Sequence, residues 1–438
     1  MARAKKEAAL TPEERLQAAL VPDWEWPYKL PGNWCWTYLT KAAECLDSFR
    51  KPINATERAG RNGNVPYYGA TGQVGWIDDF LTDEDLVLLG EDGAPFLDLI
   101  KDKAYLISGK AWVNNHAHIL RSLFGDTGNR YLLHYLNSFN YAGYVNGTTR
   151  LKLTQASMDT IPIPLPPLAE QQRIVDRIES LFAKLDEAKE KAQAVADSFE
   201  TRKAAILHKA FTGELTAKWR EEHGVSIDNW KTTRFDSVAA IRSNLVDPAE
   251  YQSFPHIAPD NIEKKTGVLL EYHTIAEDGV TSGKHRFYSG QILYSKIRPY
   301  LSKAVVVDFD GLCSADMYPI EAYQNARCLW YYMLSDEFLL QASTAGSRSV
   351  LPKINQKELS ALTVHLPTND REQEEIARIL DELFDKEQQT KEAAEIVLDQ
   401  IELMKKSILA RAFRGELGTN DPSEESAVEL LKEIIRRG

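Results

Sequence analysis

The chain has 438 residues, of which 43% are hydrophobic and 26% are charged, values that predict two to four domains of an ordinary soluble globular protein. It contains no run of eighteen apolar residues and no signal-peptide core, so we expect no membrane span. The four cysteines are far apart, which fits a reducing cytoplasm. The net charge of −12 is unfavourable for nucleic-acid binding unless local basic clusters or partner subunits supply positive charge.

The N-terminal region predicts a short helix followed by a mixed module. Thr11 is suited to cap a helix whose first residue is Pro12, because a hydroxyl can accept a free backbone N–H and proline is tolerated at the first helical position. A strand-like run at 85–89, Gly- and Asn-rich turns and a helical stretch at 130–137 come next. This mixture predicts an α+β domain.

A long helix is predicted after the first module. From Ile174 to Ile206 the apolar residues recur at alternating steps of four and three, which is the heptad seam of a coiled coil. Prolines precede the helix, Glu170 supplies a carboxylate at its positive end, and Gly213 ends it. About 40 helical residues correspond to a rod of roughly 60 Å.

The same order of elements is predicted in the second half of the chain. Strand-like runs at 291–294 and 303–307 and a helical stretch at 326–340 indicate a second α+β module. The second long helix keeps the apolar seam but departs from it at Glu387 and Thr390. A short helix is expected at 427–435, in the C-terminal tail.

An internal repeat underlies this order. Residues 170–215 return as residues 372–417 without a gap, and 20 of the 46 positions are identical. Both copies end in Ile-Leu-x-x-Ala-Phe-x-Gly-Glu-Leu, whereas the interiors of the modules hardly resemble each other. Because neither helix can bury its apolar stripe alone, we expect the two helices to pack antiparallel, with the modules at opposite ends and the tails meeting near the first module. Alternatively, each helix covers its own module or serves as an oligomerisation zipper.

Catalytic and cofactor motifs are not recognised in the chain. The glycines before Lys284 have the wrong spacing for a phosphate-binding loop. His116 and His118 alternate as on one strand face, but no third ligand is apparent, so we predict no metal site. No nucleophile is flanked by a recognisable His and Asp set, and we therefore predict no catalytic residue.

The order of these motifs resembles the specificity subunit of type I DNA restriction–modification enzymes. The most specific elements are Ile-Pro-Leu-Pro-Pro-Leu-Ala-Glu-Gln-Gln at 163–172 and Ala-Phe-Thr-Gly-Glu-Leu-Thr-Ala-Lys-Trp-Arg at 210–220. The resemblance covers residues 30–417, and the second copy departs from the pattern at 369–371. It implies two target recognition domains, each reading one half of a split DNA sequence, separated by two antiparallel spacer helices.

The resemblance also implies the partners and cofactors. We expect double-stranded DNA, two methyltransferase subunits and, in the full complex, restriction and translocase subunits. S-adenosylmethionine, ATP and Mg are expected on those subunits and not on this chain. The expected domains are an N-terminal tail at 1–29, recognition domains at 30–166 and 223–368, spacer helices at 167–222 and 369–417, and a C-terminal tail helix at 418–438.

Candidate contact residues follow from residue type, because Arg and Lys suit phosphates and guanine edges and Asn suits adenine. Isolated surface lysines, such as Lys101 and Lys103, are expected on a solvated face instead. The DNA candidates are Lys51, Tyr68, Lys110, Asn115, His116, Thr148, Thr149, Arg150, Lys284, Arg286, Lys296, Arg298, Tyr300, Lys303, Arg348 and Lys353. The partner-binding candidates are Phe211, Glu214, Phe413 and Glu416.

Two rival interpretations remain at this stage. A dimeric coiled-coil scaffold that binds only proteins explains the helices, but not two unlike modules on one template or the basic turns. An enzyme with an unrecognised site is disfavoured by the motif search.

Overall fold

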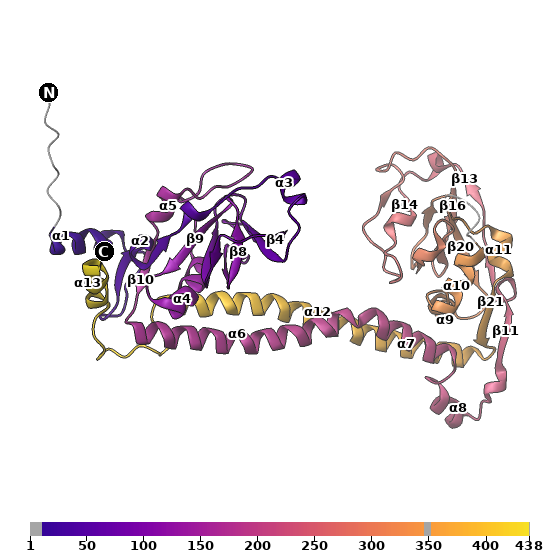
Figure 1. Cartoon of the computed structure of the whole chain (residues 1–438). Coiled ribbons are helices and arrows are strands. Elements are labelled where there is room, and N and C mark those ends of the chain that lie inside the picture. Colours follow the sequence, from indigo (N-terminus) through magenta and orange to yellow (C-terminus); the bar gives the residue numbers. More distant parts are fainter. Residues whose placement is uncertain (1–10, 346–351, 438) are drawn as a thin grey trace. The chain divides into compact units, whose positions relative to one another are not determined.

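The computed structural model of the chain describes residues 11–345 and 352–437 (Figure 1). The chain divides into two compact units, one formed by residues 1–192 and 396–438 and the other by residues 193–395. Each unit combines one α+β module with part of the long helices. The predicted α+β class and tandem organisation are thus confirmed. Among the predicted contact residues, Arg348 lies outside the described residues.

The first module is closed by pairing between its first and last strands. β1 (Cys35–Tyr38) runs antiparallel to β10 (Pro162–Leu165), so the two ends of the module lie side by side. Between them are two four-stranded sheets. The first has the order β2 (Ala43–Cys45), β9 (Ala117–Ser122), β6 (Leu86–Gly90) and β7 (Ala104–Ile107). The second has the order β4 (Gly72–Ile77), β3 (Val65–Gly69), β8 (Lys110–Val113) and β5 (Thr82–Asp83).

One helix covers the first sheet of this module and joins its core to the long helices. α4 (Gly125–Ser138) packs against β6, β7 and β9. Its buried Tyr131 and Tyr135 share a core with Ile174 and Phe413. The shorter helices of the module are α2 (Leu39–Ala42), α3 (Ala55–Ala59) and α5 (Gln155–Asp159). The strand and helix predicted at 85–89 and 130–137 are confirmed as β6 and α4.

The second module closes in the same way, with β11 (Trp230–Arg234) antiparallel to β21 (Thr363–Pro367). Its four-stranded sheet has the order β12 (Ala239–Ile241), β20 (Met317–Ala322), β17 (Ile292–Ser295) and β18 (Ala304–Val306). Its five-stranded sheet has the order β13 (Leu245–Val246), β16 (Lys284–Phe287), β19 (Gly311–Cys313), β14 (Pro255–Ile257) and β15 (His273–Thr274). The strands predicted at 291–294 and 303–307 are confirmed as β17 and β18.

The helix predicted at 326–340 is two helices in the structure. α9 (Ala326–Met333) ends at Leu334, and α10 (Asp336–Ala345) follows at once. The hydroxyl of Ser335 donates to the carbonyl of Tyr332 at 2.6 Å, a local bond that competes with helix continuation. The module also contains α11 (Gln356–Ala361). Turns of 3₁₀ helix in the chain lie at Asp23–Glu25, Asp47–Phe49, Ile227–Asn229, Phe235–Ser237, Pro248–Tyr251, Pro259–Asn261 and Pro299–Leu301.

The two repeats form long helices that pack against each other within each unit. The first repeat is α6 (Leu168–Asp197) followed after Ser198 by α7 (Phe199–Phe211), and the second is α12 (Asp370–Phe413). In the first unit Asp186 bonds Lys405 at 2.5 Å and Lys189 bonds Glu402 at 2.6 Å. One residue number rises as the other falls, so the helices run antiparallel, as predicted.

The second unit shows the same antiparallel packing between α7 and the first half of α12. Arg202 forms an ion pair with Glu387 at 2.6 Å, which explains why an acidic residue interrupts the apolar seam at that position. Lys391 lies over the ring of Phe199 at 5.0 Å. Downstream of Phe211, α8 (Ala217–His223) ends at Gly224 in the left-handed conformation.

Each repeat begins with a buried glutamate, near the start of a long helix. This glutamate accepts hydrogen bonds from residues that follow the Gly-Glu-Leu end of the other repeat. Glu372 is fully buried and accepts hydrogen bonds from Thr216 (2.9 Å), Arg220 (2.7 Å) and Trp230 (3.0 Å), with Asn229 bonding its second oxygen. In the other unit the equivalent Glu170 is also fully buried. Its partners are Thr419 (2.6 Å) and Arg173 (3.0 Å).

The tails meet against the first module, as predicted. α1 (Pro12–Ala19) begins with a capping box in which Thr11 and Glu14 bond each other's backbone N–H groups. It packs on α13 (Ala427–Arg437), where Ala427 and Leu431 join Ala19 in a small buried cluster. Within the described part of the chain, every helix is too short or too polar to cross a lipid bilayer.

Candidate nucleic-acid interface

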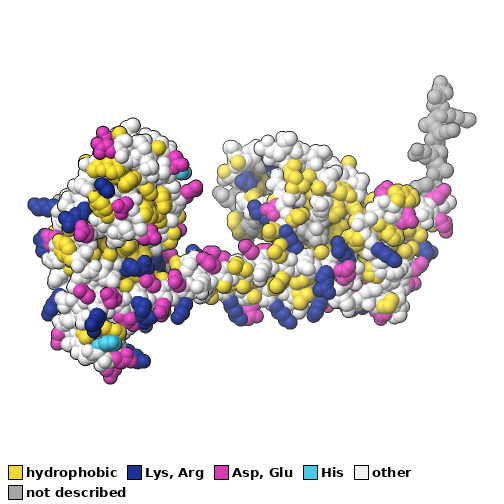
Figure 2. Space-filling view, turned by 180° about the vertical axis from the view of Figure 1, so that it is seen from behind, with side chains coloured by type: hydrophobic (Ala, Val, Ile, Leu, Met, Phe, Trp, Pro, Cys, Tyr) yellow, Lys and Arg dark blue, Asp and Glu magenta, His cyan; other side chains and the backbone are white. Residues whose placement is uncertain are grey.

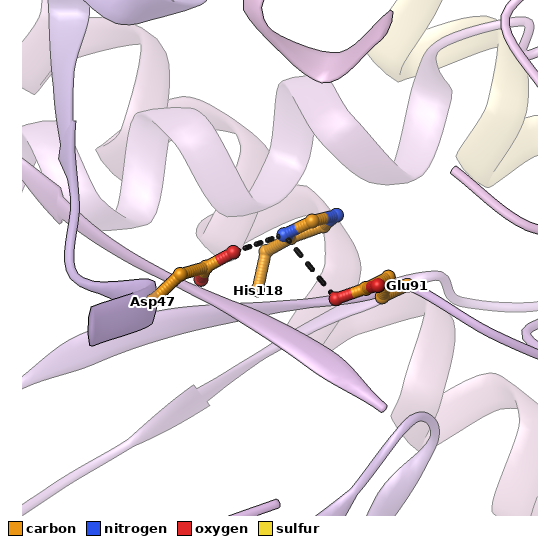
Figure 3. Close-up of side chains that lie close together, drawn as sticks. All are labelled: Asp47, Glu91 and His118. Carbon is orange, nitrogen blue, oxygen red and sulfur yellow. Dashed lines mark hydrogen bonds and ion pairs between the residues drawn. The ribbon is translucent and has the colours of Figure 1, made fainter. Parts of the chain in front are cut away.

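A buried polar cluster lies at the centre of the first module, where Asp47 and Glu91 approach His118 (Figure 3). The Nδ1 atom of His118 lies 2.6 Å from Asp47 and 3.8 Å from Glu91, and its Nε2 atom lies 2.9 Å from the carbonyl oxygen of Leu153. The two carboxylates are the further metal-type ligands that were not recognised from the sequence. Both ring nitrogens of His118 are nevertheless occupied by protein acceptors.

Cations of the protein compensate the charge of this cluster. Arg50 bonds both Asp47, at 2.9 Å, and Glu91, and Lys152 bonds Glu91 at 3.0 Å. Burial raises the pKa of Asp47, but the hydrogen bonds from His118 and the Ile119 N–H and the charges of His118 and Arg50 together outweigh it and hold that pKa below its usual value. The donor set therefore fits a structural ion-pair network better than a metal site.

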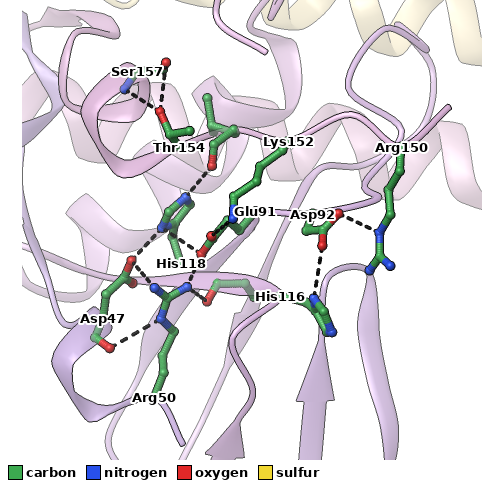
Figure 4. A network of polar contacts seen from close by, with 12 residues as sticks. Asp47, Arg50, Glu91, Asp92, His116, His118, Arg150, Lys152, Thr154 and Ser157 are labelled. Carbon is green, nitrogen blue, oxygen red and sulfur yellow. Dashed lines mark hydrogen bonds and ion pairs between the residues drawn. The ribbon is translucent and has the colours of Figure 1, made fainter. Parts of the chain in front are cut away.

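This network anchors an exposed loop (Figure 4). Asn146 and Lys152 exchange backbone hydrogen bonds of 2.9 and 2.8 Å, and residues 147–150 form the exposed tip between them. At the tip, Gly147 has φ of 110°, and a Cβ there would lie 2.4 Å from the carbonyl oxygen of Arg150, so only glycine suits the turn. The loop is therefore a preformed hairpin that presents Thr148, Thr149 and Arg150.

Two predicted contact residues of this loop lie close to a third, His116. His116, Thr149 and Arg150 line a cavity of about 680 Å³ that also includes Asn114 and Asp92. The Nε atom of Arg150 lies 2.5 Å from Asp92, and the Nδ1 atom of His116 lies 3.5 Å from the other oxygen of that carboxylate. Asp92 was missed by the sequence analysis. Its only signal was its place in the Gly-Glu-Asp-Gly turn.

The other candidates in the first module are more scattered. Lys51 lies over the ring of Trp112 at 5.8 Å, and Lys110 lies over Phe80 at 4.6 Å. Tyr68 is half-buried against Tyr105, whereas Asn115 is exposed. One interpretation is wrong, because Lys103 is buried at the start of β7, with 2% of its surface exposed, and does not lie on a solvated face. Its backbone N–H donates to Asn137, which holds that segment against α4.

The second module presents a basic turn at residues 296–303. Lys296 donates to the carbonyl of Ala315 at 2.5 Å, and Lys303 donates to that of Pro259 at 2.7 Å, so both ammonium groups are held in place. Arg298 and Tyr300 are exposed at the tip. Lys353 joins this region through a backbone bridge to Ile297. The structure thus brings together five of the candidates predicted in this module.

Two further candidates in this module are placed differently. Lys284 is buried and donates to the hydroxyl and carbonyl of Ser282 at 2.7 and 3.0 Å. Arg286 is half-buried in a box formed by the rings of Tyr251, Phe254 and Tyr288, whose centroids lie 5.4, 5.9 and 4.8 Å from its guanidinium carbon. The sequence analysis did not anticipate this aromatic box.

The predicted partner-binding residues divide into two kinds. Phe211 and Phe413 are buried against Tyr332 and against Tyr131 and Tyr135, so they belong to the cores of the modules and leave no side-chain surface for a partner. The acidic residues of the same motifs, Glu214 and Glu416, are exposed. Along the long helices basic and acidic side chains alternate, with hydrophobic side chains between them (Figure 2).

Acid is expected to weaken the first module at the Asp47 network. Burial raises the pKa of Glu91, but bonds from Arg50 and Lys152, with the charge of His118, together hold it below its usual value, and the neighbours of Asp47 do the same for that carboxyl group. A carboxyl group whose pKa is lower in the folded state contributes stability that is complete above the unfolded-state value of about 4, and is lost as the pH falls through the folded-state value. Denaturation in urea at several pH values between neutral and acidic should show this loss. The Asp47→Asn variant should show a weaker pH dependence, and an unchanged dependence would contradict the assignment.

Comparison with known proteins identifies the family. The family described as the type I restriction modification DNA specificity domain matches residues 45–195 and 227–397. The EcoDI specificity subunit of a type I restriction enzyme from Escherichia coli is 35% identical over 405 residues, which are 86% of this chain and 89% of that protein. A putative type I specificity subunit from Haemophilus influenzae is 35% identical over 145 residues, 33% of this chain and 36% of its own length.

Solved structures share the fold. A chain from a structure of a type I restriction–modification system is 18% identical, with a TM-score of 0.65 over 89% of this chain and all of that chain. The HsdS subunit of Thermoanaerobacter tengcongensis is also 18% identical, with a TM-score of 0.56 over 90% of this chain and all of that chain.

The chain therefore belongs to the DNA specificity subunits of type I restriction–modification systems. Its two modules are target recognition domains. As a specificity subunit it is the non-catalytic component, and the cofactors of such a system reside on the methyltransferase and restriction subunits. This assignment agrees with the absence of a recognised catalytic motif in the sequence.

Proposed function

We propose that each module reads one half of a bipartite DNA sequence through its own basic loop, and that the long helices set the gap between the halves. In the first module the reading surface comprises the loop at 147–150 with His116 and the neighbouring Asn115. In the second it comprises the turn at 296–303 with Lys353. Arg286 and, at the edges of the modules, Lys51, Tyr68 and Lys110 are secondary contacts. The proposed domain limits are those expected from the sequence.

The observation that carries this proposal is that each unit contains an exposed basic segment held in place by its own module. Arg150 is fixed by Asp92, and the Arg298 turn is fixed by the carbonyl groups that accept from Lys296 and Lys303. Preorganised side chains lose little conformational freedom on binding, which favours specific readout. Two rigid readers on one side of a duplex place their half-sites about one helical turn, roughly 34 Å, apart.

We further propose that two methyltransferase subunits and, through the complete assembly, restriction subunits bind the conserved helices, and that the complex works in the cytoplasm. Exposed apolar side chains on α12 support the binding of partner subunits to these helices. Ile396, Leu403 and Met404 are 57%, 60% and 50% exposed and recur at helical spacing. Apolar side chains grouped on one helix face are typical of a surface that a partner covers. The exposed Glu214 and Glu416 stand at the ends of the two repeats and are available to the same partners.

Methylation assays of the reconstituted complex test the two-reader proposal. Arg150→Ala should lower discrimination only at bases of the first half-site, and Arg298→Ala only at bases of the second. A lost base contact should cost about 1–3 kcal/mol at its own base pair, whereas a lost phosphate contact weakens binding to all sequences alike. Lys101→Ala is the matched control, because Lys101 is exposed and its ammonium group, among the described residues, pairs only with Asp98, at 3.7 Å. If the Arg150 and Arg298 variants lose discrimination at the same base pairs, the proposal is wrong.

A further inference from the structure

A buried lysine of the spacer helix donates hydrogen bonds to the backbone of the second recognition domain. Lys203 on α7 is 8% exposed, and its ammonium group donates to the backbone carbonyls of Lys265 at 2.7 Å and Thr266 at 3.4 Å. The ring of Phe384 on α12 lies 5.6 Å from the same group. Within the described residues Lys203 forms no ion pair with a carboxylate, so two carbonyl oxygens and an aromatic face hold its charge. Burial lowers its pKa.

The segment that Lys203 holds is bonded directly to the basic turn. The backbone N–H of Lys265 donates to the carbonyl oxygens of Leu301 at 3.1 Å and Ser302 at 3.3 Å. On its other side, Gly267 packs so closely on Trp330 that a Cβ at this position would lie 2.2 Å from the indole ring. A continuous set of contacts therefore runs from the spacer helix through residues 265–267 to the turn at 296–303.

Backbone strain is concentrated at this junction. Among the described residues, the non-glycine residues with positive φ are Lys265 (63°), Arg298 (48°) and Ser302 (45°), and all three lie in this set of contacts. Arg298 also precedes a proline, where the α conformations are further disfavoured. Such conformations cost about 1–3 kcal/mol each and persist only where surrounding contacts enforce them. The two hydrogen bonds of Lys203 are among the contacts that do so.

The internal repeat provides a matched comparison for this lysine. A shift of 202 residues relates Lys203 to Lys405 and Phe384 to Phe182, and Lys405 lies 5.2 Å from the ring of Phe182. Lys405, however, pairs with Asp186 on the facing helix at 2.5 Å. Both copies thus keep the lysine on the aromatic ring. In the first unit the lysine joins the two long helices through Asp186, whereas Lys203 bonds the backbone of the recognition domain.

We propose that Lys203 is a positioning residue for DNA recognition by the second domain: it holds residues 265–267, and through them the turn carrying Arg298, in the conformation that meets DNA. This inference rests on the proposed role of that turn in reading the second half-site. Without the ammonium group, two buried carbonyl groups lose their donor and the strained turn loses part of its support. Discrimination at the second half-site should then fall while the first is unaffected.

Methylation by the full complex, with wild-type and Lys203→Met subunits, tests the proposal on targets altered in one half at a time. Methionine keeps the apolar stem and removes the donor. We expect discrimination at the second half-site to fall about five- to tenfold, the equivalent of roughly one hydrogen bond, and discrimination at the first half-site to be unchanged. Lys405→Met should alter neither. Equal effects of the two variants on both half-sites, or no effect of Lys203→Met, would overturn the proposal.

A second measurement covers the case in which Lys203→Met folds poorly, and an Arg298→Ala arm separates this inference from the function on which it rests. Hydrogen exchange of the assembled complex should be faster in Lys203→Met at residues 262–270 and 296–303, and unchanged at residues 104–113. Uniformly faster exchange, or no faster exchange at residues 296–303, counts against the proposal.

If Arg298→Ala impairs the second half-site and Lys203→Met does not, only this inference fails. If Arg298→Ala leaves that half-site unaffected, the role proposed for the turn fails.

Discussion

Replacing Glu372 with alanine is expected to destabilise the second unit by about 3–5 kcal/mol, because it leaves a buried guanidinium without its carboxylate. The side chain of Arg220 is only 11% exposed and bonds Glu372 at 2.7 Å, and Thr216 and Trp230 bond the same oxygen. Calorimetric unfolding of the whole chain, or urea denaturation followed by hydrogen exchange of each unit, would measure the loss. An effect below about 1 kcal/mol, as for an exposed ion pair, would contradict this prediction.

A pair of Glu→Gln substitutions, at Glu372 and at the equivalent Glu170 of the first unit, provides a matched comparison. Glu170 is as buried as Glu372, but its partner Arg173 is 37% exposed and is shared with Glu424. Burial raises the pKa of Glu170, whereas four hydrogen bonds outweigh burial and hold the pKa of Glu372 below its usual value. Lowering the pH should therefore reduce the contribution of Glu372 and favour the protonated form of Glu170. We expect Glu170→Gln to be tolerated at neutral pH better than Glu372→Gln.

Truncation of Phe413 to alanine is the second prediction with a large expected effect. Its ring is 2% exposed and lies 5.3 Å from the ring of Tyr131 and 5.1 Å from that of Tyr135. Removing a buried phenylalanine side chain costs about 3–5 kcal/mol through lost apolar burial and the cavity left behind. The first unit should unfold at lower urea concentration. A stability loss below about 1 kcal/mol would show that the ring is not part of this core.

Glu416 lies three residues away and separates the structural role of the motif from partner binding. It is exposed, so Glu416→Ala should leave the free energy of unfolding within about 0.5 kcal/mol of wild type. If the exposed part of the motif binds a methyltransferase subunit, this variant should nevertheless retain fewer methyltransferase copies on co-purification. An unchanged stoichiometry in Glu416→Ala and Glu214→Ala variants of full stability would place the docking surface elsewhere on the helices.

The sequence by itself determined the arrangement of the chain. The repeat at a spacing of 202 residues and the alternating four- and three-residue apolar steps predicted two long antiparallel helices, and those helices are present as α6, α7 and α12. Periodicity can be read directly from the sequence, because each turn of a helix must present an apolar side chain to the same neighbour. The N-terminal tail helix was predictable from a different local signal, the cap at Thr11 followed by the proline at position 12.

Only the tertiary structure decided which polar residues share a site. Asp92 lies 58 residues before Arg150 in the chain, and Lys203 lies 62 residues before Lys265, so no local pattern connects either pair. Burial could not be predicted from residue type either, because lysine is usually a surface residue, yet Lys103 and Lys284 are buried within their modules. Charge and residue type are encoded locally, whereas burial and partnership depend on how irregular sheets bring distant turns together. For this reason the sequence determined the family and its scaffold, and the fold determined which polar side chains lie together and which of them are held in place.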